Sequence, residues 1–237
     1  MTTKTTLIAA TIAMLVMGSA LQAETVDTRI GKLEFTHSFA DGYPTDATVE
    51  KLFKEMDFQR AVQAYIWAIP FVSMAQWQYA HVQQLGAENG QAVFLESYKD
   101  RLGGLTYNAT TPYVLPFIDL AEGPWVVVMP EAEVRGAAHD MWQIAITAMT
   151  EPGKYLFVGP GQEVPKDAEA QGYKVSKSPS NNILVGIRLM ATDEKTRLEG
   201  LEQIQVYPYA ERANPKPRLS LKITQVFDLM KRNVLVQ

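Results

Sequence analysis

The hydrophobic period of the chain changes at the glycine pair Gly103-Gly104, and this change constrains the fold more than any other feature. Before the pair, apolar residues recur at the 3.6-residue spacing that lines one face of a helix. After it, short apolar runs alternate with a period of two between Gly and Pro residues, which is typical of strands. We therefore predict an α+β chain, with an N-terminal segment and helical region over residues 24–104, a β-sandwich over 105–191 and a C-terminal helical segment and tail over 192–237.

Turn and cap residues divide the helical region. The stretch 49–56 carries apolar residues at i, i+3, i+4 and i+7. Asp57 can cap a second helix, whose apolar face runs up to Pro70. Because proline lacks an N–H and clashes with the preceding turn, Pro70 should end or kink that helix. The stretch 71–85 is helical again, with Gly86 as its stop.

The β-sandwich is predicted from four short apolar stretches. Residues 125–129 and 155–158 are short runs between turn residues, and residues 142–146 and 183–189 alternate apolar with other residues. No helix is available for crossovers, so an antiparallel sandwich is favoured over a parallel sheet. We expect one strand to bury the face formed by Ile183, Val185, Ile187 and Leu189.

The C-terminal segment is expected to hold two helical stretches. The first runs from about Asp193 to Ile204, and Pro208 follows it. The second carries one apolar stripe, formed by Ile223, Val226, Phe227 and Met230. Such a stripe must be covered. Two alternatives stay open: it docks on the protein's own core, or it binds a partner.

Residues 1–23 have the pattern of a signal peptide. Lys4 precedes an apolar run, and small residues follow, so cleavage is expected after Ala23, with Ala20 as the alternative. An uncleaved anchor is the competing interpretation, but the run is shorter than the roughly 20 residues of a spanning helix. We predict a periplasmic or secreted protein with no stable membrane anchor after cleavage.

Composition excludes several classes of protein. The chain has no cysteine, so disulfides and thiol catalysis are excluded. Its 22 basic and 26 acidic residues give a net charge of -4, which argues against nucleic-acid binding. The three histidines lack metal-ligand spacing, and no nucleotide-loop or Gly-x-Ser-x-Gly pattern occurs. We therefore predict neither a metal nor a cofactor.

The most unusual local stretch, residues 106–113, combines polar and aromatic side chains. Its Asn and Thr side chains can bond their own backbone and fix a tight turn. The functional alternative is a loop that faces a ligand beside the sheet. Carboxylates such as Asp119 and Asp140 could serve a hydrolase, or they could be solvated turn residues. His139 and Asp140 are poor partners, because neighbours on a strand point to opposite faces.

The order of several motifs resembles the bacterial domain-of-unknown-function family numbered 1254. The resemblance rests on residues 58–70, 108–113, 119–124, 140–142, 153–156, 159–161 and 178–181, together with Pro130 and Arg188. The likeness covers roughly residues 45–210. It implies a small helical region and an immunoglobulin-like sandwich, but no known activity. In longer members a jelly-roll domain numbered 1214 follows, and we expect this chain to be without it.

The resemblance also implies a candidate site at one end of the sandwich, because its polar residues gather there. The site residues are Asn108, Thr111, Tyr113, Asp119, Asp140 and Arg188. The family's turn commonly reads Asn-x-Asp-Thr-x-Tyr, whereas Thr110 stands here in place of the Asp.

Two functions compete. The first is an exported module that binds a small ligand or a protein, the partner being a separate 1214-type companion or a second copy held through the 223–230 stripe. The alternative is a periplasmic hydrolase that uses carboxylates near Asn108 and Tyr113.

Overall fold

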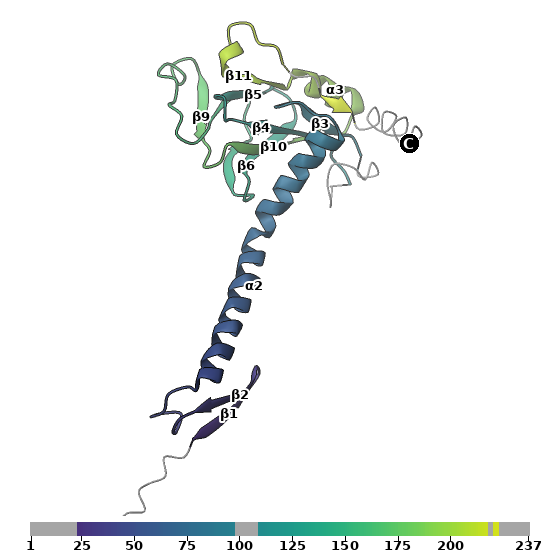
Figure 1. Ribbon diagram of the computed structural model, residues 1–237. Coiled ribbons are helices and arrows are strands. Elements are labelled where there is room, and N and C mark those ends of the chain that lie inside the picture. The colour runs from purple at the N-terminus through teal and green to yellow at the C-terminus, as the bar shows by residue number, and fades with distance from the viewer. Residues whose placement is uncertain (1–22, 98–108, 218–219, 223–237) are drawn as a thin grey trace, which may run out of the picture. The chain divides into compact units, whose positions relative to one another are not determined.

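The computed structural model describes residues 23–97, 109–217 and 220–222 (Figure 1). The chain divides into two units, Met1–Trp67 and Ala68–Gln237. Nearly all of the predicted signal peptide, the site residue Asn108 and the apolar stripe at 223–230 lie outside the described residues.

The first unit pairs a hairpin with the start of a long helix. Strands β1 (Glu24–Thr28) and β2 (Gly31–Phe35) are antiparallel, and the helix α2 spans Asp46–Tyr79. The buried Thr48 joins the two, because its Oγ1 accepts a hydrogen bond of 2.7 Å from the Glu34 N–H. Arg29 in the hairpin turn also pairs with Glu55 on the helix.

The prediction of two helices separated at Asp57 is wrong. Residue 57 lies inside α2, and its carboxylate pairs with Arg60 at 3.7 Å, one helical turn further on. No glycine interrupts this stretch, and an i,i+3 ion pair supports a helix instead of starting one. The helix also continues through Pro70. It passes into a short π-helical turn, η1 (Ala80–Gln84), and Gly86 follows with a φ of +73°, consistent with the predicted stop.

The second unit contains two sheets that pack as a sandwich, so the predicted α+β fold is confirmed. The six-stranded sheet has the order β12-β3-β4-β10-β6-β7, and the four-stranded sheet has the order β11-β5-β8-β9. Their strands are β3 (Ala92–Leu95), β4 (Tyr113–Asp119), β5 (Trp125–Met129), β6 (Val134–Asp140), β7 (Ala145–Met149), β8 (Gly153–Val158), β9 (Tyr173–Lys177), β10 (Asn182–Leu189), β11 (Gln205–Pro208) and β12 (Leu221–Lys222). The helix α3 (Glu194–Gln203) and the short 3-10 turn η3 (Tyr209–Glu211) flank β11.

The main core lies between the two sheets and includes the predicted face of β10. The side chains of Ile183, Val185, Ile187 and Leu189 are at most 1% exposed, which confirms that prediction. They pack with residues of the facing sheet such as Val127.

Pairing is mostly antiparallel, as predicted, and two strand pairs are parallel. β8 pairs in parallel with β9, and β12 pairs in parallel with β3. A parallel return needs a connection of about a dozen residues or more, and it need not be helical. Residues 159–172 provide that length between β8 and β9 through turns, with Gly161 and Gly172 at positive φ.

The predicted strand over residues 142–146 is shorter than expected. Trp142 lies in a turn, Gln143 has a φ of +64°, and β7 begins only at Ala145. The buried Asp140 holds this turn, because its carboxylate accepts hydrogen bonds from the backbone N–H of Trp142 and of Ile144. In contrast, α3 confirms the predicted helix, with Asp193 as its N-cap.

Candidate functional site

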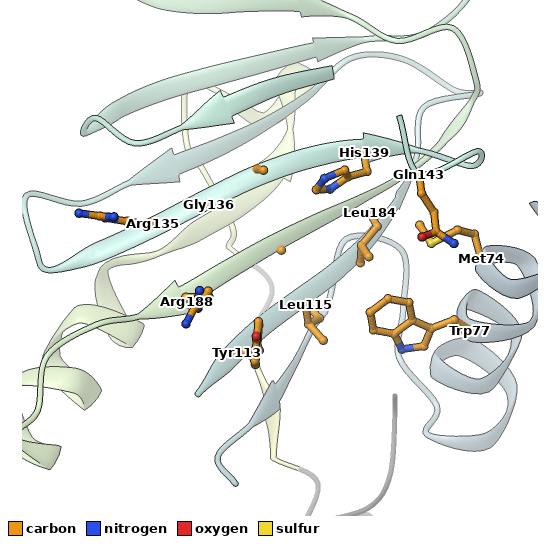
Figure 2. A pocket seen from close by; sticks show the side chains of 12 residues that line it. Met74, Trp77, Tyr113, Leu115, Arg135, Gly136, His139, Gln143, Leu184 and Arg188 are labelled. Carbon is orange, nitrogen blue, oxygen red and sulfur yellow. The ribbon is translucent and has the colours of Figure 1, made fainter. Parts of the chain in front are cut away.

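A cavity of about 540 Å³ opens on the face of the six-stranded sheet that points away from the sandwich core (Figure 2). We call it the outer cavity. Its lining comes from α2, β4, β6, β10 and the turn after β6. The twelve lining residues are Met74, Trp77, Tyr113, Leu115, Arg135, Gly136, Ala137, His139, Gln143, Leu184, Gly186 and Arg188.

Strand alternation places most of these residues on one face. Successive side chains of a strand point to opposite sides, so β10 sends its odd-numbered residues into the core and leaves 184, 186 and 188 outside. The missing side chain at Gly186 leaves room in the floor. A Cβ at this position would meet only Leu115, at 3.7 Å. The cavity is therefore open because small residues stand in the middle of the sheet's outer face.

The last turns of α2 form one wall of the outer cavity. Met74 is 2% exposed and packs in one cluster with Leu115 and Leu184. The Trp77 ring stands edge-on to Phe117 at 5.8 Å, and the buried His81 ring stands edge-on to Phe117 at 5.2 Å. These ring contacts pack the end of the helix against the sheet.

The turn after β6 closes the cavity beside this wall. The Gln143 side chain donates a hydrogen bond of 3.4 Å to the Pro70 carbonyl of α2, and the Trp142 ring packs on Phe71 at 4.5 Å. Gln143 adopts the left-handed backbone conformation that long side chains rarely take. The buried Asp140 stabilises that turn, so it positions Gln143 at the cavity from outside it.

The opposite end of the outer cavity is positively charged (Figure 2). Arg188 of β10 stands directly across from Arg135 of β6 in the strand register. Arg188 donates from Nε to the Thr111 hydroxyl at 3.1 Å, and its guanidinium lies 5.8 Å from the centre of the Tyr113 ring. Neither arginine forms an ion pair with a described residue, and none of the twelve lining residues carries a carboxylate. Like charges directly opposite each other on a sheet are destabilising.

Three of the six predicted site residues come together here. Thr111, Tyr113 and Arg188 meet through the hydrogen bond and the ring contact, and Tyr113 and Arg188 line the cavity. Asn108 lies outside the described residues. The structure therefore joins the predicted site residues at the start of β4 and at the end of β10.

The two predicted carboxylates lie at the other end of the sheet. Asp119 pairs with Asn182 and Asp140 with Ile183, whereas Tyr113 pairs with Arg188. Five residues of strand separate the two ends, about 17 Å. Asp119 accepts a hydrogen bond from the Ala121 N–H at 2.9 Å, as Asp140 does from the turn after β6. Both carboxylates hold turns, and neither lines the outer cavity.

Sequence reasoning missed Arg135, His139 and the α2 wall. The stretch Val134–Asp140 contains Gly and Ala but few β-branched residues, so it was not predicted to be a strand. Once it is recognised as a strand, its period of two places Arg135, Ala137 and His139 on one face. The structure agrees that His139 and Asp140 are no pair: the first lines the cavity and the second caps a turn.

Comparisons with known proteins bear on the fold. Residues 90–208 match the model of a family described as "Protein of unknown function (DUF1254)". The second likeness is to the crystal structure of the VPA0106 protein from Vibrio parahaemolyticus, with 19% sequence identity and a TM-score of 0.50. It covers 65% of this chain and 39% of that chain, so the chain spans less than half of the neighbour's length. No curated protein matches the chain.

Proposed function

The chain belongs to the DUF1254 family, whose function is unknown, and from that premise we propose that it is an exported module that binds a small ligand in the outer cavity. One observation carries the proposal: a cavity of about 540 Å³ with a mainly apolar lining and a few polar side chains. Small-molecule sites have volumes of about 300–1,000 Å³ and this kind of lining. The α2 wall and the strands below it would hold the polar groups in place.

The hydrolase alternative has less support. It placed carboxylates near Tyr113, but Asp119 and Asp140 lie at the far end of the sheet and are engaged with backbone N–H groups. A general acid or base must reach the substrate within hydrogen-bond distance. The lining of the outer cavity offers no carboxylate for that role among the described residues.

Gly186 provides a direct test of ligand binding. Replacing it with Leu would fill the cavity floor from a strand position where a Cβ meets no close atom. The matched control is Gly186→Ala, which adds one methyl group and leaves most of the cavity open. In a thermal-shift screen of a metabolite library, we expect compounds that stabilise the wild type and Gly186→Ala but not Gly186→Leu. If every stabilising compound acts equally on Gly186→Leu, the cavity is not the binding site.

A second candidate function, binding of a protein partner, is favoured by the surface of α2 in the first unit. Phe58, Tyr65 and Ile66 are 60–72% exposed. Contiguous exposed apolar side chains mark interaction sites in soluble proteins. No helix in the described part of the chain is long and apolar enough to cross a membrane. We propose that a separate 1214-type companion or a second copy covers this surface.

Sedimentation of the purified chain tests the partner proposal. We expect the wild type to self-associate or to bind the companion, and Phe58→Glu with Ile66→Glu to abolish the association. Gln63→Glu on the same helix is the control for added charge. If the predicted C-terminal stripe binds the partner instead, Phe227→Glu should abolish the association. A wild type that stays monomeric and does not bind the companion would contradict the proposal.

Mass measurement tests export. We expect exported protein to begin at Glu24 or, as the alternative, at Leu21, and to be found outside the membrane fraction. A full-length species in the membrane fraction would contradict export with cleavage.

A further inference from the structure

We propose that the outer cavity selects an amphiphilic anion: a carboxylate head held between Arg135 and Arg188, with an apolar body lying along β10 toward Trp77. This inference rests on the proposed ligand-binding function and specifies the class of ligand. Figure 2 shows the arrangement, with the two arginines and Tyr113 at one end and Met74 and Trp77 at the other. Leu115 and Leu184 lie between the two ends.

The charged end argues for an anion. Arg135 and Arg188 are opposite each other in the strand register, and no described carboxylate forms an ion pair with either of them. A planar guanidinium fits a carboxylate through two parallel hydrogen bonds. Arg188 is already oriented, because Thr111 holds its Nε and the Tyr113 ring lies beside it. A bound carboxylate would therefore neutralise the two positive charges, and Arg188 is already held in place to receive it.

The apolar end argues for a body attached to that anion. Four residues of β10 separate Arg188 from Leu184, which corresponds to about 13 Å of strand. The floor along this distance is formed by Gly186, Leu115 and Leu184, and the α2 wall follows. An inorganic anion would use the arginines and leave this apolar length exposed. A straight-chain or aromatic acid would use both ends.

Octanoate and 1-octanol are the matched probes, because they share the same chain length and differ in the charged head. Isothermal titration of the purified chain should show octanoate binding at least about tenfold more tightly than 1-octanol, as expected for one or two charge-assisted hydrogen bonds. Acetate, which carries the head alone, should bind more weakly than octanoate. Raising the ionic strength should weaken the binding of octanoate and leave that of 1-octanol unchanged.

Arginine variants locate the head. Arg135→Gln and Arg188→Gln should each remove most of the preference for octanoate, and Arg135 is exposed, so its replacement should leave the fold intact. Arg60→Gln, an exposed arginine on α2 in the first unit, removes the same charge and should retain the preference.

These experiments distinguish recognition of a charged head from ligand binding in the outer cavity as such. Equal affinities for octanoate and 1-octanol, both lost in Gly186→Leu, would overturn the charged head and keep the ligand-binding function. Affinities that Gly186→Leu leaves unchanged would overturn both. An octanoate preference that survives in the double variant Arg135→Gln, Arg188→Gln would overturn the assignment of the head.

Discussion

The two faces of β10 differ in side-chain size, in burial and in charge. Its core face presents four large aliphatic side chains that are at most 1% exposed and meet the facing sheet. Its outer face presents Leu184, Gly186 and Arg188. The first has an apolar side chain, the second has none, and the third has a charged one. One strand thus contributes both to the densely packed core and to an open cavity.

This difference shows how stability and binding can be separated within one element. Core packing is close, so the inner face is restricted to residues of the right volume. The outer face is released from that requirement wherever α2 does not cover it, and there the sequence holds Gly186 and an arginine pair. The predictions below test this separation, beginning with the largest expected effect.

Val185→Asp should have the largest effect, because it places a charge among fully buried aliphatic side chains. An unpaired buried charge costs several kcal/mol, or the group becomes neutral at a similar cost. We expect loss of soluble protein, measured as the soluble fraction after expression and as the midpoint of chemical unfolding. Unchanged stability would mean that the core assignment of β10 is wrong.

Asp140→Ala should have the next largest effect, mainly on stability. The variant removes the acceptor of two backbone N–H groups in the turn after β6. Each lost hydrogen bond contributes about 0.5–1.5 kcal/mol, so we expect a loss of about 1–3 kcal/mol in chemical unfolding. Asp119→Ala, which loses one such bond, should cost less. A stable Asp140→Ala variant that has lost ligand binding would instead show that Asp140 takes part in binding.

Thr111→Val should have the smallest effect. It removes one hydrogen bond, from Arg188 Nε, at the rim of the outer cavity. A net cost of about 0.5–1.5 kcal/mol is expected, with a loss of several-fold in octanoate affinity as the guanidinium becomes less well oriented. Titration calorimetry measures the affinity. A loss beyond a hundredfold would instead indicate that Thr111 contacts the ligand directly.

The sequence predicted the core face better than the outer face, for a physical reason. Burial of one face imposes a period of two on the large residues of β10, and β5 could be recognised as a short β-branched run between two prolines. β6 could not, because a strand that borders an open cavity needs no large side chains. The site residues on β4 and β10 followed from a family resemblance, whereas Arg135 needed the strand register.

The roles of the two carboxylates could not be predicted from the sequence either. Asp119 and Asp140 were attractive as acids in a polar region, and a sequence does not show which backbone N–H groups lie near a side chain. In the structure both complete turns at strand ends. The prediction of two helices in place of α2 has the same cause. An Asp residue can cap a helix or lie within one, and the sequence around Asp57 does not distinguish the two.

Two neighbouring substitutions on β10 test the separation of the faces most directly. Chemical unfolding and octanoate titration should be measured together on Val185→Ala and Gly186→Leu. The first should lose about 2 kcal/mol of unfolding free energy and retain the wild-type affinity for octanoate, because it changes only the core. The second should keep the wild-type stability and lose octanoate binding. If both variants lose stability equally, or if Gly186→Leu binds octanoate as the wild type does, the two faces do not have separate roles.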